Sequence, residues 1–241
     1  NINSFGLRTI ALISMIILNV AWSGIISSLW LQLILGTIGS GSITLFVFLL
    51  EEGYKNTSNI TKYMVRLLVL GVISAAPYYL VFGNYDMPIY APQNLFSSPL
   101  TLFFCLGTIS LYDKLNGRQI KIFAVAFFCI ISFIFRFEWC PYALILMFII
   151  HIYREDIRYR DFYIVMFFGA FAVVSGVMYL IGIFGTNLEI IKNISLVGCI
   201  WPVFFIRKYN GQQGKRVKFM SYSIYPLMLI SLYLIKVCMS R

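Results

Sequence analysis

The sequence predicts an all-α, polytopic integral membrane protein, a bundle of about nine transmembrane helices. Of its 241 residues, 60 % are hydrophobic and only 12 % are charged, and the mean hydropathy is +0.85. Soluble globular domains are roughly 45–50 % apolar and about 25 % charged. Apolar stretches close to the roughly 20 residues that a helix needs to cross a bilayer recur along the chain, without the alternation of outer-membrane strands. The excess apolar side chains are therefore expected to face lipid.

The apolar stretches follow one another closely, so the whole chain, 1–241, is predicted to form a single transmembrane domain. The sixth stretch is short and begins at Cys140-Pro141, so we expect it to tilt or to start as a loop. Residues 24–37 are apolar enough to add an interfacial segment anchored by Trp30. The expected spans are 7–23, 38–54, 63–82, 96–112, 120–136, 139–153, 162–184, 189–206 and 219–237.

The basic residues alternate between the two sides of these spans. Fourteen of the 19 lysines and arginines lie in or within a few residues of the connections after the second, fourth, sixth and eighth spans. The connections after the first, third, fifth and seventh spans hold only Arg136 and Lys192. Because basic loops remain in the cytoplasm, the pattern predicts a cytoplasmic N-terminus in a multi-pass protein of the bacterial plasma membrane.

Charge and cysteine content argue against two other classes of partner. The net charge of +10 is explained by the cytoplasmic loops of a membrane protein rather than by nucleic-acid binding. The five cysteines are scattered through apolar stretches and form no C-x-x-C pair. We therefore expect the lipid bilayer as a partner, but no nucleic acid and no metal.

One polar turn carries a specific resemblance. FLLEEGYKNTSNITKYMVRLL, Phe48 to Leu68, combines a helix end at Gly53 with N-cap candidates that include Asn59. It resembles the TraX family, named for a conjugal-transfer protein that acetylates pilin, and the broader acyltransferase type 3 membrane enzymes. The family run F-L-L-x-E-G-Y, T-x-N, K-Y-x-x-R-L-L is matched at Phe48, Leu49, Leu50, Glu52, Gly53, Tyr54, Thr57, Asn59, Lys62, Tyr63, Arg66, Leu67 and Leu68.

Weaker likeness extends along most of the chain. The segments LRTIALISM, QNLFSSPLTLFFCLG, FEWCPYALILMFIIHIYR and YSIYPLMLISLYL are each similar to a family segment. The resemblance implies acetyl transfer from acyl-CoA, which would be a co-substrate rather than a bound cofactor, to a peptide, pilin or sugar acceptor. It also implies that the basic side chains of Lys55, Lys62 and Arg66 contact the phosphates of acyl-CoA.

The chain departs from the family where the resemblance would place proton transfer. The family's Asp-His pair is replaced by Leu18 and Asn19, its Gly-Arg by Gly39-Ser40, and its closing-helix histidine by Met228. The family's Phe-Pro within the second helix is replaced as well, by Ile43-Thr44. The residues expected to line the corresponding pocket are Asn19, Ser40, Asn94, Arg136 and Met228.

Other ionisable residues remain as catalytic candidates, because burying them in a membrane is costly. They are His151, Glu138 and Glu52. Each also has a structural interpretation, as an interfacial side chain or as part of a turn. Asn19 likewise fits helix packing, since membrane amide hydrogen bonds contribute about 0.6 kcal/mol on average.

Two functions are therefore open. The first is a TraX-like acyltransferase, either with the usual mechanism lost or with a rearranged site. The second is a catalytically inactive homologue that binds a membrane protein partner, as a subunit or an immunity-like protein. Acyl-CoA turnover would favour the first, and a stoichiometric partner without acyl-CoA binding would favour the second.

Overall fold

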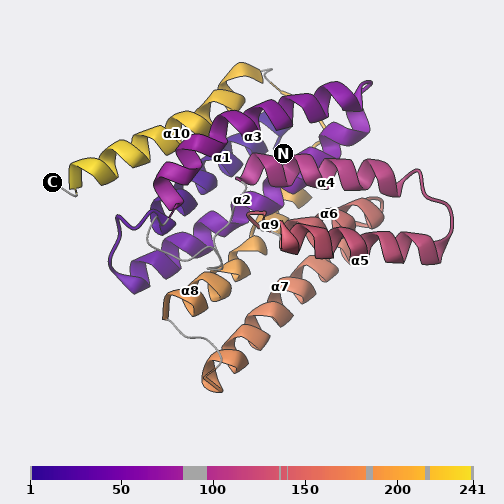
Figure 1. Ribbon diagram of the computed structural model, residues 1–241. Helices are drawn as coiled ribbons and strands as arrows, with labels where there is room; N and C mark the ends of the chain where they lie inside the picture. The colour runs from indigo at the N-terminus through magenta and orange to yellow at the C-terminus, as the bar shows by residue number, and fades with distance from the viewer. Residues whose placement is uncertain are drawn as a thin grey trace. The chain divides into compact units, whose positions relative to one another are not determined.

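A computed structural model describes residues 2–83, 97–135, 137–139, 141–182, 187–214 and 218–239 (Figure 1). Within these ranges the only β-type pairing is an isolated bridge between Ile2 and Tyr209. The all-α fold class is confirmed. The helices are α1 Ser4–Trp22, α2 Leu29–Asn56, α3 Ile60–Phe82, α4 Ser98–Tyr112, α5 Arg118–Ile134, α6 Tyr142–Ile152, α7 Ile157–Leu180, α8 Asn187–Ser195, the 3₁₀ helix η1 Leu196–Cys199, α9 Pro202–Arg207 and α10 Lys218–Met239.

Each expected span coincides with helical structure, and the eighth is shared by α8, η1 and α9. Within the described ranges, five helical stretches are long and apolar enough to cross a membrane, and three further apolar helices are shorter. The protein is therefore a multi-pass membrane protein. The expectation of a separate interfacial segment at 24–37 was wrong, because residues from Leu29 onward are continuous with α2. Trp30 is nonetheless 77 % exposed on that helix.

The chain groups into two compact units. Unit 1 consists of residues 1–49 and 153–221, and unit 2 of residues 50–152 and 222–241. The boundary falls within α2, which contributes to both units. The single-domain organisation expected from the sequence stays a prediction.

The N-cap of helix α3 is Asn59, one of the N-cap residues that the sequence suggested. Asn59 accepts a hydrogen bond from the backbone N–H of Lys62 and so caps α3. The preceding helix continues to Asn56, past the predicted end at Gly53. A Cβ atom at Gly53 would lie 2.9 Å from the ring of Tyr63, so glycine is required there for close packing rather than to end the helix.

Unit 1 is held together by close approaches of helix backbones. A Cβ atom on Gly39 would lie 2.6 Å from the backbone of Leu18, and one on Gly198 only 1.7 Å from the carbonyl oxygen of Thr37. Small residues allow this kind of packing between membrane helices. The core of the unit is therefore closely packed where α1, α2 and η1 meet.

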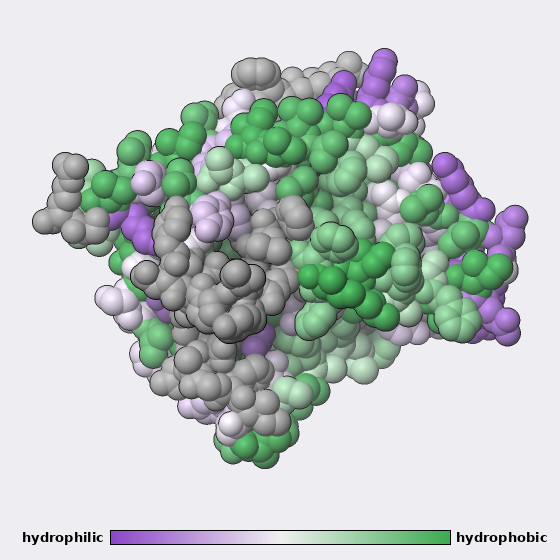
Figure 2. Space-filling model, viewed as in Figure 1, coloured by the Kyte–Doolittle hydropathy of each residue, from purple (hydrophilic) through white to green (hydrophobic). Residues whose placement is uncertain are grey.

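Apolar side chains also cover much of the outer surface, as expected of helices that face lipid. Green, hydrophobic residues occupy wide stretches of the face drawn in Figure 2. Helix α5 in unit 2 buries only Ser132, while Phe123 and Phe133 are 76 % and 72 % exposed. In unit 1, α7 exposes a similar series of large apolar residues.

Candidate functional site

A carboxylate lies in the turn between α5 and α6 of unit 2. The hydroxyl of Ser98 donates a hydrogen bond of 2.5 Å to Oε2 of Glu138, and the backbone N–H of Ser98 also bonds to this carboxylate. The hydroxyl of Thr101 donates to the Glu138 carbonyl oxygen at 2.6 Å. Ser98 is the first residue of α4, so Glu138 lies at the positive end of that helix. The first turn of α4 thus fixes both the backbone and the side chain of Glu138.

A tyrosine hydroxyl from α10 reaches the same place. The Tyr225 side chain is only 3 % exposed, and its hydroxyl lies close enough to Glu138 and Ser98 to interact with both electrostatically. Among the described residues, nothing meets hydrogen-bond geometry with this hydroxyl or with that of the buried Ser97. Buried polar atoms without partners are rare in native proteins. The group of Ser98, Glu138 and Tyr225, here called the turn cluster, therefore brings two hydroxyl groups and a carboxyl group together.

The turn cluster also changes the acidity of its carboxyl group. Loss of water around Glu138 raises its pKa from 4.5 to about 7, and this outweighs the hydrogen bonds from Ser98, which lower the pKa. A carboxylate with a pKa near the working pH can both accept and return a proton. Glu138 is thus chemically suited to general acid–base work.

The backbone beside Glu138 is strained. Trp139 has a φ of 68°, which is uncommon for any residue with a side chain and a genuine outlier for a bulky one. Such strain costs roughly 1–3 kcal/mol and tends to occur at functional sites. The turn therefore holds Glu138 in place at a cost in stability.

The turn cluster unites three segments that are far apart in the sequence. Ser98 comes from QNLFSSPLTLFFCLG, Glu138 from FEWCPYALILMFIIHIYR and Tyr225 from YSIYPLMLISLYL. These are three of the four segments with a weaker family resemblance. Their contact could not be inferred from the sequence, because nothing in the spacing sets the rotation of the helices about their axes.

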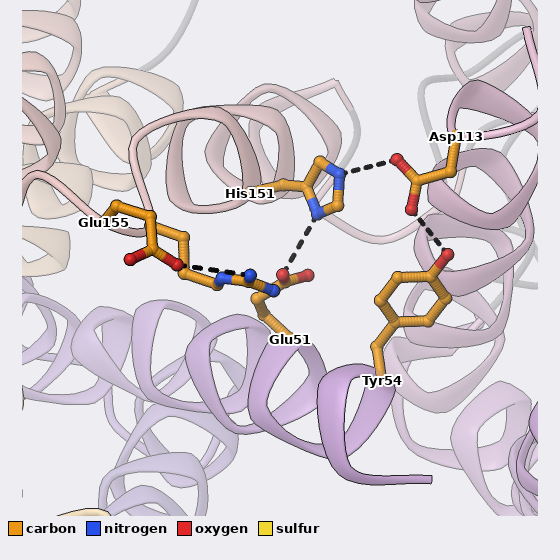
Figure 3. Close-up of polar contacts among 6 residues, drawn as sticks. Glu51, Tyr54, Asp113, His151 and Glu155 are labelled. Carbon is orange, nitrogen blue, oxygen red and sulfur yellow. Dashed lines mark hydrogen bonds and ion pairs between the residues drawn. The ribbon is translucent and has the colours of Figure 1, made fainter. Parts of the chain in front are cut away.

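A second polar group lies at the other ends of α4 and α6, also in unit 2 (Figure 3). His151 Nδ1 lies 3.0 Å from Oε1 of Glu51, and Nε2 lies 2.9 Å from Oδ1 of Asp113. The hydroxyl of Tyr54 donates to Oδ2 of Asp113 at 2.6 Å. These four residues are called the histidine clamp below. Because both ring nitrogens face carboxylate oxygens, the doubly protonated imidazolium fits the clamp best.

The clamp partly differs from what the sequence suggested. His151 was a candidate, but the carboxylate that contacts it is that of Glu51, whereas the sequence pointed to its neighbour Glu52. Glu51 has a side chain that is 2 % exposed. Neither Asp113 nor Tyr54 was singled out as a site residue. Among the described residues, no group of three or more histidine, cysteine or acidic side chains is arranged to hold a metal ion.

Exposed basic residues lie near the clamp in sequence. The residues expected to contact acyl-CoA, Lys55, Lys62 and Arg66, are all exposed at the end of α2 and the start of α3. The ammonium group of Lys121 lies 4.6 Å from the ring centre of Tyr112, which in turn packs edge-on against His151. Positive charge is therefore available at this end of unit 2.

Two expected pocket residues lie in unit 1 and use their polar groups within their own helices. The buried Asn19 donates its amide hydrogen to the carbonyl oxygen of Met15 at 2.8 Å. The Ser40 hydroxyl donates to the Gly36 carbonyl oxygen at 2.7 Å. Neighbouring Thr44 donates to the Cys199 carbonyl oxygen at 2.8 Å. These contacts support packing roles at positions where the family resemblance would place catalytic groups.

The remaining expected pocket residues divide in two groups. Met228 lies on α10 in unit 2, one turn beyond Tyr225, and is partly exposed. Asn94 and Arg136 lie outside the described residues, as does most of the loop between α3 and α4.

Comparisons with known proteins place this architecture in a family. No solved structure matches the chain. A curated protein, "Probable fimbrial assembly protein FimC, serogroup H1" of Dichelobacter nodosus, is 25 % identical over 235 residues, which covers 93 % of this chain and 92 % of that protein. The family model described as TraX protein matches residues 5–236, nearly the whole sequence. The chain therefore belongs to the TraX family.

Proposed function

We propose that the protein is an acyltransferase of the bacterial plasma membrane, in which Glu138 accepts the proton of the acyl acceptor. The donor is acyl-CoA, in the simplest case acetyl-CoA, and the acceptor is a peptide, a pilin or a sugar. The main support is the turn cluster, where a carboxyl group with a pKa of about 7 is hydrogen-bonded to Ser98 beside the buried hydroxyl of Tyr225. Family membership and the fimbrial relative support a role related to pili or fimbriae.

The proposed reaction uses each member of the turn cluster. An acceptor hydroxyl or amine attacks the thioester carbonyl carbon as its proton passes to Glu138. The Tyr225 hydroxyl donates to the oxyanion of the tetrahedral intermediate, a contribution of about 10²–10³-fold for such donors. The carbon–sulfur bond then breaks, and the proton on Glu138 passes to the departing sulfur. Ser98 keeps the Glu138 carboxylate in position throughout.

The basic residues near the histidine clamp are suited to bind the phosphate-bearing end of acyl-CoA. Coenzyme A carries several phosphates and holds its thioester at the end of a long flexible arm. Lys55, Lys62 and Arg66 would bind the phosphates at the cytoplasmic side. The arm would then bring the thioester towards Glu138.

A test uses the purified protein in detergent with radiolabelled acetyl-CoA. We measure the release of the CoA thiol and the transfer of label to protein or to added membrane extract. Glu138→Gln should reduce both by about 10²-fold or more, since a positioned base contributes about 10²–10⁴-fold. The wild-type rate should rise with pH through about 7, as Glu138 loses its proton. Glu155→Gln is the matched control, because the Glu155 side chain is 87 % exposed.

A second function, that of an inactive partner-binding homologue, is favoured by the hydrogen bonds of Asn19 and Ser40 within their own helices. In that case the protein would bind no acyl-CoA and would co-purify with a stoichiometric membrane protein. Equal thiol release by wild type and Glu138→Gln would exclude our proposal for Glu138.

A further inference from the structure

The histidine clamp connects three helices of unit 2 at one end. Glu51 and Tyr54 come from the last turns of α2, Asp113 is the C-cap of α4, and His151 is the last residue but one of α6. The side chains of Glu51, His151 and Asp113 are 2 %, 14 % and 38 % exposed. In Figure 3 the imidazole ring lies between the two carboxylates and points one nitrogen at each.

The imidazole ring of His151 is surrounded by acidic and aromatic side chains from two helices. From α2 the ring faces Glu51 and Tyr54, and from α4 it faces Asp113 and the edge of Tyr112. The ends of these helices also carry the negative pole of the helix dipole, which favours a cation. Removing the ring would take away the group that bridges the carboxylates of Glu51 and Asp113.

The same two helices carry the turn cluster at their other ends. Helix α4 begins with Ser98 and ends at the clamp, while α6 follows Glu138 and also ends at the clamp. One residue of an α-helix advances about 1.5 Å along the axis. A slip of one residue between α4 and α6 would displace Ser98 and Glu138 by about 1.5 Å and could lengthen their 2.5 Å contact to as much as about 4 Å, beyond hydrogen-bond distance.

We propose that His151 is a positioning residue for Glu138. By binding Glu51 and Asp113, it fixes α6 lengthwise along α4 and so keeps Glu138 against Ser98 at the opposite ends of these helices. The catalytic importance of this link rests on the proposed function, but the link itself does not. His151 does not touch the acyl group in this scheme.

The test follows the carboxyl group of Glu138 directly, without turnover. Infrared difference spectra of the protein in nanodiscs, recorded from pH 4 to 9, show the C=O band of protonated carboxyl groups, and Glu138→Gln identifies the band of Glu138. In wild type this band should disappear with a midpoint near pH 7. In His151→Ala the midpoint should fall by at least one pH unit, because a displaced turn admits water, and the band frequency should shift as the Ser98 hydrogen bond is lost.

Further variants separate positioning from general loss of structure. Ile152→Ala alters the neighbouring, 53 % exposed residue of α6 and should leave the spectrum unchanged. Asp113→Asn weakens the contacts that His151 and Tyr54 make with α4 but keeps the contact between His151 and Glu51, so it should shift the midpoint in the same direction by less. His151→Lys returns a cation to the clamp and should restore part of the shift.

The outcomes distinguish the two proposals. If His151→Ala shifts the band as expected but the wild type transfers no acyl group, the proposed function fails while the positioning role stands. If His151→Ala and Asp113→Asn fold and leave both midpoint and frequency unchanged, the positioning role is overturned. In an active protein, His151→Ala should also move the pH–rate midpoint with the spectroscopic one.

Discussion

At the scale of single residues, the candidate site depends on which of two adjacent side chains faces inward. Glu51 and Glu52 are equally acidic, but successive residues of a helix point about 100° apart. Only Glu51 is buried against His151. The family resemblance covered Glu52 and so drew attention to the neighbour of the carboxylate that contacts His151. Composition and spacing carry no information on helix rotation, which is why the sequence singled out His151 and Glu138 as candidates but not Glu51, Tyr54 or Asp113, which lie beside His151 in the structure.

Glu138→Gln should have an effect on stability that depends on pH. The pKa of Glu138 is raised in the folded protein, so the folded state holds a proton that the unfolded chain releases between pH 4.5 and about 7. Wild type should therefore lose stability as pH rises through this window, by at most about 3.5 kcal/mol, since each pKa unit is worth about 1.4 kcal/mol. Glutamine stays neutral and avoids this loss.

Thermal unfolding in detergent at pH 5 and pH 8 checks this prediction. The melting temperature of Glu138→Gln relative to wild type should be higher at pH 8 than at pH 5. If the difference in melting temperature between Glu138→Gln and wild type were the same at pH 5 and pH 8, the Glu138 carboxyl group would be well hydrated in the folded protein.

Asn19→Ala should have little effect on stability or on acyl transfer. The amide donates to the Met15 carbonyl oxygen of its own helix, which already takes part in the helical hydrogen-bond ladder. We expect a loss of less than about 1 kcal/mol in unfolding free energy, in line with small hydrogen-bond contributions in membranes. Acyl transfer should be unchanged. A loss of transfer without a loss of stability would instead place Asn19 in a catalytic pocket.

At the scale of helices, hydropathy and length predicted most of the architecture. Each expected span is matched by helical structure, because apolar length is set by the bilayer. Two details could not be predicted from hydropathy and length. Residues 29–37 continue α2, and the eighth span breaks into α8, η1 and α9. The break coincides with Gly198 packed against α2 and with Pro202 at the start of α9, so it reflects a contact between helices as well as a proline in the local sequence.

Gly198→Ala should disrupt this contact. The added Cβ atom would lie 1.7 Å from the carbonyl oxygen of Thr37, a backbone atom that cannot rotate away. Overpacking of this kind typically costs about 1–3 kcal/mol, and we expect the upper end of that range. Gly176→Ala on α7 is the matched control, because no atom lies within 4 Å of its added Cβ.

Chemical unfolding of the two glycine variants gives the comparison. Gly176→Ala should be neutral or slightly stabilising, since alanine favours helices by up to about 1 kcal/mol over glycine. If Gly198→Ala proved as stable as Gly176→Ala, the close approach of η1 to α2 would be wrong.

At the scale of the whole molecule, contacts within each unit test the predicted topology. In unit 1 the backbone N–H of Ile2 donates to the Lys208 carbonyl oxygen at 2.9 Å, and Arg207 pairs with Asp161. The charge pattern places all four residues on the cytoplasmic side. An error of one span would have put these partners on opposite faces of the membrane, so the contacts agree with the orientation.

In unit 2, contacts at the predicted cytoplasmic ends and at the predicted outer ends of the helices also join residues of the same side. The histidine clamp joins the ends of the second, fourth and sixth spans, all predicted to be cytoplasmic. The Lys236 ammonium donates to the Val81 carbonyl oxygen at 3.0 Å, and Ser98 donates to Glu138. These four residues lie at predicted outer ends. Contacts between distant segments therefore supply independent support for the predicted number of spans, while the orientation still depends on the charge pattern alone.

Reporter fusions test the orientation itself. Alkaline phosphatase is active only outside the cytoplasm, and green fluorescent protein fluoresces only when it folds in the cytoplasm. We predict fluorescence for fusions after Thr57, Leu115, Glu155 and Asn210, and phosphatase activity for fusions after Ile26, Phe137 and Gly182.

The most informative pair of fusions follows Leu115 and Phe137, which bracket α5. This helix has 17 residues, fewer than the roughly 20 that commonly cross a bilayer, yet its two ends lead to Asp113 in the clamp and to Glu138 in the turn cluster. If α5 crosses, the clamp is cytoplasmic, where acyl-CoA is made, and the turn cluster opens towards an acceptor outside. Fluorescence from both fusions would place both clusters on the donor side. Acceptors beyond the membrane would then be out of reach of Glu138, and transfer would have to occur on a cytoplasmic substrate.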